Sequence, residues 1–381
     1  MAGPLTGVRI VDLTTVVMGP SATQILGDLG ADVIKIEAAS GDSMRNIGPM
    51  RSPGMGPLFL QSNRNKRAIV LDLKSPAGIE KLRELIAGSD VLVSNIRPQA
   101  LARLGLDYAN AAKINPSIIY CAAVGYGQGG PYAGEAVYDD LMQAASGISG
   151  MFHRVDGKPR YAPVNICDRV VGLYTVIAIQ AALYHRHLTG EGQEVEVPMF
   201  ETMADFVLSD HIGGRAFAPV IGDTGYLRLL SRTRGPYATS DGYIAVVVYT
   251  DLHWRKFSAM IGRPNLIDED ERLRDMQART THAEVAGQTL ADELARKSTG
   301  EWLAEFHARD IPVCRVNSVE DLFEDRHLRA VGFFREMEHP TEGAVTVPRP
   351  PLNFSRTPLE IRMLAPRLGE HNEEFGLAPR P

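Results

Sequence analysis

Asp168 is the carboxylate whose sequence neighbours are most typical of a chemical site rather than of a solvated surface. It opens the segment 168–174, which leads into a long apolar stretch that closes at Gly190. Aspartate is also a preferred residue at a helix N-terminus, where its carboxylate accepts hydrogen bonds from free backbone N–H groups. On this stretch alone a helix cap is the simpler interpretation, and a carboxylate nucleophile is the alternative.

Cys167, which precedes Asp168, is a second group that could act as a nucleophile. No partnered histidine is apparent, so a buried thiol is the expected role. With Cys121 and Cys314 it makes three cysteines, without the spacing of a metal site or an even disulfide framework. This usage is typical of a reducing cytoplasm, and no metal is expected.

The overall composition is that of an ordinary globular protein, and it narrows the classes of partner. The chain has 381 residues, more than one hydrophobic core usually supports, so two domains are expected. Its formal net charge of −6 argues against nucleic-acid binding as the main activity. The N-terminus lacks a signal-peptide pattern, and the longest apolar run, about 170–184, is short for a bilayer. We therefore expect no membrane partner and a cytoplasmic location.

Alternating strand and helix patterns must position these residues. Short apolar runs typical of buried strands recur at 8–13, 31–37, 68–71, 90–94 and 117–124. One helix is expected to end at Gly30, and another, at 75–87, carries a proline in its first turn. This alternation predicts a doubly wound, mostly parallel, Rossmann-like α/β sheet. Ligands bind at the carboxyl ends of such strands, which are here the loops 14–18, 37–42, 72–74, 94–98 and 124–131.

Two features of these loops suit an anionic ligand. The segment 125–131 is rich in glycine, and its backbone N–H groups either stabilise an oxyanion or form a simple tight turn. It lacks the Lys-Ser/Thr of a P-loop, and no Gly-x-Gly-x-x-Gly follows the first strand, so a dinucleotide dehydrogenase is unsupported. Basic residues near the loops either neutralise a nucleotide's phosphates or are solvated side chains: Lys66, Arg67, Lys74, Arg97 and Arg103.

The character of the chain changes near residue 200. Residues 235–248 predict a β-hairpin with a Ser-Asp-Gly turn, and helical patterns follow at about 252–261, 282–295 and 300–308. A smaller α+β domain is therefore expected at 235–320, joined through a linker at 206–234 to a large domain that begins with 1–205. The last segment, 321–381, is predicted to return to the large domain.

Seven segments, taken in order, resemble the class III CoA-transferases, the family of the formyl-CoA and carnitine-related CoA-transferases. They are 5–13, Gly19-Pro20, 29–37, 65–67 with 71–74, 95–98 with 103–105, 168–192 and 369–371. Each piece alone is a weak motif, but their order along nearly the whole chain is specific. The resemblance implies an intertwined homodimer.

The resemblance also assigns roles to residues. Asp168 becomes the nucleophile. Coenzyme A and its acyl thioesters are implied as substrates, together with a small carboxylic acid, with no tightly bound cofactor and no metal. The CoA contacts fall on Val16, Val17, Leu71, Asp72, Leu73, Lys74, Asn95, Ile96, Arg97, Arg103, Ala136, Val137, Tyr138 and Asp139.

The implied reaction splits one transfer into easier covalent steps. The Asp168 carboxylate would attack the thioester carbonyl and give a mixed anhydride and CoA thiolate. The thiolate then attacks the anhydride, which releases the first acid and leaves an aspartyl-CoA thioester, and the acceptor acid reverses these steps. A helix N-terminus would favour the ionised carboxylate by about 0.3–1 kcal/mol.

Two departures from the family pattern bear on the substrate. Ala38 stands where family members often place an arginine toward the adenine of CoA. The stretch 227–234 has no run of glycines like that of formyl-CoA transferase, which puts formyl and oxalyl substrates in doubt. Three arginines of that stretch, Arg228, Arg232 and Arg234, either pair with the distal carboxylate of a dicarboxylic acid such as succinate or are exposed charges.

Two other functions stay open from the sequence. The α-methylacyl-CoA racemases resemble this family, but they place a histidine base after a similar glycine loop, where this chain has Tyr138. His153 lies nearby in sequence, and a surface or structural role is the simpler interpretation for it. The third function is CoA binding without turnover, against which the retained Asp168 argues.

Overall fold

The computed structural model describes residues 3–379, which form two compact units. Unit 1 comprises the chain up to Ser146, Tyr161–Asp205 and the chain from Arg326 onward. Unit 2 comprises Gly147–Arg160 and Phe206–Asp325. Residues 206–234, predicted as a linker, are therefore part of unit 2, and the chain returns to unit 1 at Arg326 rather than at residue 321.

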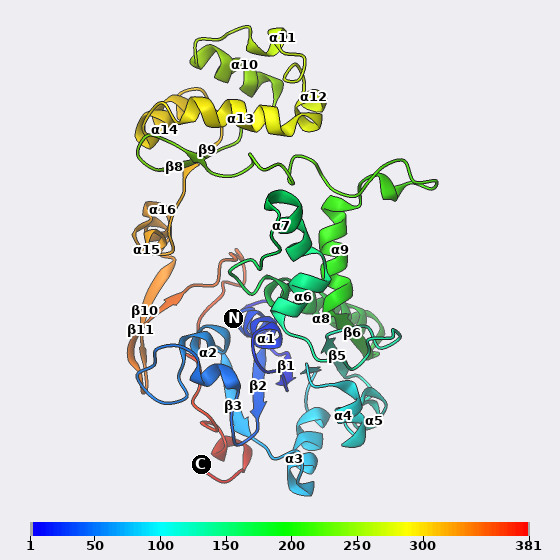
Figure 1. Ribbon diagram of the computed structural model, residues 1–381. Coiled ribbons are helices and arrows are strands. Elements are labelled where there is room, and N and C mark those ends of the chain that lie inside the picture. The colour runs from blue at the N-terminus through cyan, green and yellow to red at the C-terminus, as the bar shows by residue number, and fades with distance from the viewer. Residues whose placement is uncertain (1–2, 380–381) are drawn as a thin grey trace. The chain divides into compact units, whose positions relative to one another are not determined.

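A six-stranded parallel sheet is the framework of unit 1 within the described residues. Its strands are β1 (Arg9–Asp12), β2 (Asp32–Glu37), β3 (Lys66–Val70), β4 (Val91–Ser94), β5 (Ile119–Val124) and β6 (Gln193–Pro198). The order is β3-β2-β1-β4-β5-β6, so the direction of strand addition reverses between β1 and β4 (Figure 1). The predicted doubly wound α/β fold is confirmed. The sequence does not predict β6, because Glu194 and Glu196 interrupt its apolar residues.

Helices cover both faces of this sheet. The helices α3 (Pro76–Ala87), α4 (Pro98–Arg103) and α5 (Tyr108–Ile114) pack on one face, in an apolar cluster that includes Val11 and Leu92. Alternate strand residues point to the opposite face, where α1 (Met18–Asp28) and α8 (Ile166–Thr189) lie against each other. The remaining helices of this region are η1 (Ser43–Asn46), α2 (Pro57–Ser62), α6 (Asp139–Ala145) and α9 (Met199–His211), the last of which continues into unit 2.

The helix α8 carries Asp168 in its first turn. Gly172 permits its close approach to α1, because a Cβ there would come 3.0 Å from the carbonyl oxygen of Met18. Its 24 residues are long and apolar enough, by length and composition alone, to cross a membrane, which corrects the expectation of too short an apolar run. The core helix of a globular protein can have the same length and apolar composition. Val171 and Ile179 are fully buried on one side of α8, as in such a core helix.

The C-terminal part of unit 1 closes the outer edge of the sheet. It contains α16 (Arg326–Ala330), a hairpin of β10 (Phe334–His339) and β11 (Gly343–Pro348), and η3 (Glu373–Phe375). At the edge strand β3, the N–H of Ala68 donates to Nδ1 of His371 at 3.2 Å. The N–H of Val70 donates to Oδ1 of Asn372 at 2.9 Å. The last segment of the chain thus completes the sheet that the first segment begins.

Unit 2 is a smaller α+β unit with its own core. The predicted hairpin is present as β7 (Tyr237–Ala238) and β8 (Tyr243–Val246), and β9 (Val313–Arg315) adds a third antiparallel strand. Its helices in the described chain are α7 (Ile148–Asp156), η2 (Gly213–Ala216), α10 (Asp251–Met260), α11 (Leu266–Glu269), α12 (Met276–Thr281), α13 (Ala283–Leu294), α14 (Thr299–His307) and α15 (Asp321–Glu324). Trp254, Phe257, Trp302 and Phe306 are buried in the core that these elements share.

Candidate active site

The candidate site lies at the carboxyl edge of the unit 1 sheet, where β1 and β4 diverge. Ligands bind there in doubly wound folds, because the reversal of strand order leaves a crevice between the loops. Asn95, in the loop after β4, reaches across to the loop after β1. Its Oδ1 accepts the N–H of Thr15 at 3.0 Å, and its Nδ2 donates to the carbonyl of Thr15 at 2.9 Å. The Asn95 side chain therefore fixes the β1 loop at the point where strand order reverses.

Two buried side chains hold the same β1 loop from the side of β2. The Nζ of Lys35 donates to the carbonyl of Thr14 at 2.8 Å and pairs with Asp42 at 3.1 Å. Asp42 in turn accepts the N–H of Val16 at 3.2 Å. Val16 has a φ of +71°, which is rare for a β-branched residue and costs on the order of 1–3 kcal/mol. Three consecutive loop residues are thus positioned before any ligand arrives.

Lys66 and Arg67, for which phosphate binding and solvent exposure were the two alternatives, have structural roles instead. Lys66 is fully buried, and its Nζ lies 3.1 Å from Oδ2 of Asp12. Burial lowers the pKa of Lys66 to about 8, although Asp12 acts in the opposite direction. Arg67 pairs with Asp32 at 2.7 Å. Neither side chain is available to a phosphate in this arrangement, so the phosphate-binding alternative is wrong for both.

Lys74, Arg97 and Arg103 are exposed, as a phosphate-binding cation must be. None of the three takes part in an ion pair within residues 3–379. Lys74 follows β3 and Arg97 follows β4, which are three strand spacings apart in the sheet, about 14 Å. The remaining predicted contacts of these loops are Val17 at the N-cap of α1, Leu71, Asp72 and Leu73 after β3, and Ile96 after β4. All of these residues lie along one edge of the sheet.

The glycine-rich loop after β5 is a tight turn rather than a free set of donors. The N–H of Gly127 donates to Oε1 of Glu201 at 2.9 Å, and the N–H of Gln128 donates to Oε1 of Glu196 at 3.2 Å. The N–H of Gly130 donates to the carbonyl of Gly127 at 3.1 Å. These three N–H groups are already satisfied, so the oxyanion role is wrong for them.

Asp168 is not the helix cap that its sequence position suggests. The helix α8 begins at Ile166 with Asn165 as its N-cap residue, so Asp168 is the third residue of the helix. The Asn165 side chain makes no capping hydrogen bond to the described residues. Instead, the N–H of Asp168 donates to Oδ1 of Asp139 at 3.0 Å. A carboxylate from another helix therefore caps α8, and that of Asp168 is not used for capping.

Asp139 is itself held from its other side. It is the first residue of α6 and is 8% exposed. Gln143, one turn along α6, donates from Nε2 to Oδ2 of Asp139 at 2.6 Å and accepts the N–H of Ala162 at 2.8 Å. Both oxygens of Asp139 thus have partners, so this geometry makes it a support for Asp168 rather than an open CoA contact. The other predicted contacts of this segment, Ala136, Val137 and Tyr138, lead into α6.

The surroundings of Asp168 favour its protonated form more than water does. Burial raises the pKa of its carboxyl to about 6, and the negative charge of Asp139 adds to the rise, while Arg169 opposes it. At pH 7 about nine molecules in ten are still ionised there. Arg169 donates to Oγ of Ser21 at 2.8 Å, which ties the first turn of α8 to the first turn of α1, next to the β1 loop. A half-buried carboxyl with a perturbed pKa at such an edge is typical of a functional site.

Cys167 does not compete with Asp168 for the role of nucleophile. It is fully buried, and burial raises the pKa of its thiol to about 12. The thiolate is the reactive form of cysteine, and it is scarcely populated at neutral pH with such a pKa. This agrees with the expected role as a buried thiol.

The sequence does not reveal the support of Asp168 by Asp139 and Gln143. Asp139 and Asp168 lie 29 positions apart, so only the tertiary fold brings them together. The one local signal is the spacing of Asp139 and Gln143, which places both side chains on the same side of a helix.

The fold and the site together define a doubly wound α/β protein with a half-buried carboxylate beside the reversal of strand order. Comparison with known proteins narrows this class to one family. Residues 5–372 match the model of CoA-transferase family III. The chain belongs to CoA-transferase family III, and the expected family and enzyme class, a CoA-transferase that uses CoA thioesters, are confirmed.

Relatives with named activities cover nearly the whole chain. The succinate–glutarate CoA-transferase of Agrobacterium fabrum is 34% identical, over 97% of this chain and 94% of its own length. The formyl-CoA:oxalate CoA-transferase of Streptomyces coelicolor is also 34% identical, over 98% of this chain and 94% of its own length. The solved structure of a CAIB/BAIF family protein from Brucella suis has a TM-score of 0.82 and 32% identity, and the match covers 99% of both chains. Sequence identity alone therefore does not select the acid.

Proposed function

We propose that this CoA-transferase moves CoA from the thioester of a dicarboxylic acid, such as succinyl-CoA, to a free dicarboxylic acid, with Asp168 as the nucleophile. The Asp168 carboxylate is the observation that carries the mechanism. It is half-buried and has a raised pKa, and its backbone is fixed to Asp139. The names of two relatives, a succinate–glutarate and a succinyl-CoA:glutarate CoA-transferase, support the choice of acid.

The proposed reaction proceeds by four nucleophilic attacks. An Asp168 oxygen attacks the thioester carbonyl, the C–S bond breaks, and an aspartyl anhydride and CoA thiolate form. The thiolate attacks the aspartyl carbonyl, which releases the donor acid as a carboxylate and leaves CoA as a thioester on Asp168. The acceptor carboxylate attacks this thioester and frees the thiolate. The thiolate then takes the acceptor acyl group from the new anhydride, which restores the Asp168 carboxylate.

The position of Asp168 on α8 suits both states of its carboxyl group. The first turn of a helix favours a negative charge by about 0.3–1 kcal/mol, which supports the ionised form that attacks. The anhydride and the thioester are neutral, and burial favours neutral groups. Because its N–H is held by Asp139, the aspartyl group keeps one backbone position through all steps.

We infer that CoA lies along the carboxyl edge of the unit 1 sheet. The β1 loop is fixed there by Asn95, and Lys74, Arg97 and Arg103 offer unpaired positive charges to its phosphates. Arg45 does not replace the arginine that is missing at Ala38. Glu37 binds its guanidinium through two hydrogen bonds, of 2.8 and 2.6 Å, and the group is buried. The adenine end of CoA is therefore expected to bind without an arginine from the β2 loop.

The racemase alternative requires a base that this site does not place after the glycine loop. Tyr138 occupies that position and is 65% exposed. A neutral phenol accepts a proton near pH 7 much less readily than an imidazole does. His153, the nearby histidine, is exposed on α7. These features support transfer rather than epimerisation.

Asp168→Asn tests the proposed nucleophile, and Asp140→Asn, which alters an exposed carboxylate of α6, is the matched control. Incubated with succinyl-CoA alone, the wild-type chain and Asp140→Asn should gain the mass of CoA less one water, the mass of an aspartyl-CoA thioester, in intact-protein mass spectrometry. Asp168→Asn should gain none and form no glutaryl-CoA from glutarate, while it still binds CoA in calorimetry. Full transfer activity in Asp168→Asn would rule out this nucleophile. Exchange of an α-proton of a 2-methylacyl-CoA, without movement of CoA between acids, would establish the racemase.

We also propose a homodimer, supported by the exposed side of α8. Leu173, Ile177, Tyr184 and Leu188 recur at helical spacing and are 52–66% exposed. An apolar stripe of this kind is typical of an interaction surface. Light scattering should give twice the chain mass of 41.6 kDa, and Ile177→Glu should shift the protein toward the monomer; a wild-type monomer would contradict the proposal.

We propose the cytoplasm as the location of the protein, because its three free cysteines suit a reducing compartment.

A further inference from the structure

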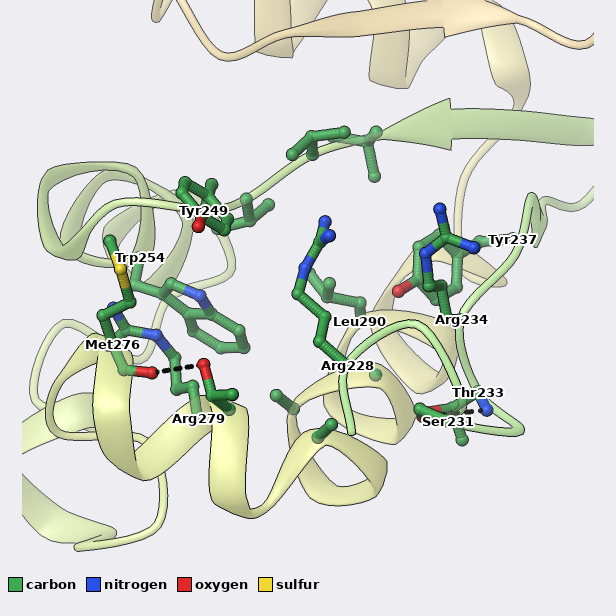
Figure 2. A pocket seen from close by; sticks show the side chains of 17 residues that line it. Arg228, Ser231, Thr233, Arg234, Tyr237, Tyr249, Trp254, Met276, Arg279 and Leu290 are labelled. Atoms are coloured by element: carbon green, nitrogen blue, oxygen red, sulfur yellow. Dashed lines mark hydrogen bonds between the residues drawn. The ribbon is translucent and has the colours of Figure 1, made fainter. Parts of the chain in front are cut away.

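Unit 2 contains a small cavity between α13 and the segments 228–237 and 246–249. Its volume is about 90 Å³. Because one water needs roughly 10–15 Å³ by this kind of measure, the cavity suits several waters or a small organic molecule, and not a nucleotide. Figure 2 shows Arg228 in the middle of the cavity, with Trp254 and Tyr249 on one side and Arg234 and Tyr237 on the other.

The lining of this cavity carries positive charge without matching negative charge. None of the described residues that line it is acidic. Of its three arginines, Arg279 is buried and paired with Asp251. Arg228 and Arg234 form no ion pair within the described part of the chain. Two uncompensated guanidinium groups favour a small anion with two negative charges.

Aromatic and apolar groups complete the lining. The guanidinium of Arg228 lies over the ring of Tyr249, 5.2 Å from its centroid. Burial raises the pKa of Tyr237, although the positive charges of Arg228 and Arg234 oppose the rise, so its hydroxyl stays a neutral donor. Leu290, from the core of unit 2, contributes an apolar wall that suits methylene groups.

The segment that carries the two arginines is fixed to the rest of unit 2. The N–H of Tyr226 donates to Nδ1 of His211 at 3.2 Å, and the N–H of Arg232 donates to Oε1 of Glu284 at 2.7 Å. At Gly287 of α13, a Cβ would come within 2.1 Å of Oγ1 of Thr233, so only glycine permits this contact. The cavity is therefore formed before any ligand binds, which reduces the entropy lost on binding.

We propose that this cavity binds a small dicarboxylate, whose two carboxylates pair with Arg228 and Arg234 while its methylenes lie against the apolar wall. A monocarboxylate would leave one guanidinium unpaired, and inorganic phosphate would leave the apolar wall uncovered. The choice of a dicarboxylate rests on the proposed function, whereas the anion site rests on unit 2 alone. Arg232 is not part of it, because its Nε donates to the carbonyl of Val155 at 3.1 Å and its side chain does not line the cavity.

Binding is best measured on the full chain with Asp168→Asn, so that no turnover interferes. Trp254 lines the cavity, so its fluorescence, checked by calorimetry, reports occupancy by succinate, glutarate, butyrate or inorganic phosphate. We expect saturable binding of succinate or glutarate. Arg228→Gln and Arg234→Gln should each weaken it by about tenfold or more, since each removes one charge-assisted pair. Arg232→Gln, the matched control, should leave the affinity unchanged.

Three results would overturn this proposal. They are no saturable binding of either dicarboxylate, the same affinity in Arg234→Gln as in Arg232→Gln, and binding of phosphate or butyrate as tight as that of the dicarboxylates. Arg234 is exposed, so its substitution is compatible with folding, which melting temperatures will check. Because the measurement needs no turnover, failure of this site and failure of Asp168 as nucleophile are separate outcomes.

Discussion

Asp139→Asn should move the acid limb of the turnover profile to lower pH. Asp168 must be ionised to attack, so wild-type turnover should fall as the pH falls through about 6, the pKa of its carboxyl. Burial is the larger cause of this raised pKa, and the like charge of Asp139 is the second. Asparagine keeps an oxygen that can accept the N–H of Asp168 but removes the charge, so only the second cause disappears.

The size of the shift follows from the share that Asp139 contributes. The pKa of Asp168 rises from 3.8 to about 6, and burial takes the larger part. The charge of Asp139 is the smaller of the two causes that raise the pKa. If its removal lowered the pKa by about one unit (~1.4 kcal/mol), the ionised fraction at pH 5 would increase from about a tenth to about a half, and turnover about fivefold. At pH 8 the carboxyl is ionised in both proteins, so its ionised fraction no longer differs.

The quantity to measure is the ratio of turnover at pH 5 to turnover at pH 8, with the same donor and acceptor for each protein. The new amide also turns an NH2 group toward Nε2 of Gln143, and a resulting displacement of Asp168 would lower turnover at both pH values. The ratio cancels that loss. Asp140→Asn should leave the ratio unchanged. An unchanged ratio in Asp139→Asn, or a wild-type limb centred near pH 4, would refute the electrostatic argument.

Three further predictions concern stability and the packing of α8. Folding raises the pKa of Asp168, so its ionised form opposes folding. Asp168→Asn should therefore raise the free energy of unfolding at pH 7 by about 3 kcal/mol, and with it the Tm. This advantage appears between about pH 4 and 6 and is absent below pH 4. Lys66→Met leaves Asp12 buried without its ion pair and should lower the free energy of unfolding in urea by about 3–5 kcal/mol. Lys81→Met, which removes a surface ion pair, should lower it by less than about 1 kcal/mol. Equal losses of stability in the two variants would contradict the argument. Gly172→Val places a side chain against the backbone of α1 and should lower the free energy of unfolding by about 1–3 kcal/mol. Because Asp168 lies one helical turn before Gly172, the displacement should lower kcat more than it lowers the affinity for CoA.

The parallel sheet can be predicted from the sequence because five of its strands contain short, mainly apolar runs, as strands buried on both faces do. The strand β6 follows another rule. Its Glu196 accepts the N–H of Gln128 in the loop after β5, so a polar residue is needed in a strand of the central sheet. That requirement comes from a loop residue 68 positions earlier in the chain, so no local sequence pattern predicts it.

The site could be predicted only in part. Residue chemistry alone favours a cap at Asp168, and this is wrong because α8 begins at Ile166, so the family resemblance was needed to identify the nucleophile. The same resemblance led to Asp139 but not to its bond with the N–H of Asp168. The sequence suggests that Lys66 is a cation near a loop, because it does not show that Asp12 lies beside Lys66 in the folded sheet. Local sequence patterns therefore do not predict which buried charged residues pair across long distances in the chain.

His371 and Asn372 close the outer edge of β3 only after a long further stretch of the chain has been synthesised. Their bonds to Ala68 and Val70 span 303 and 302 positions, so the ribosome must add about three hundred residues after β3 before the edge is covered. At about 5–20 residues per second this interval lasts roughly 15–60 s. An open strand edge is a template for association with other chains. The nascent protein is therefore expected to depend on chaperones during that interval, and a chain that ended before His371 would keep the edge open after release.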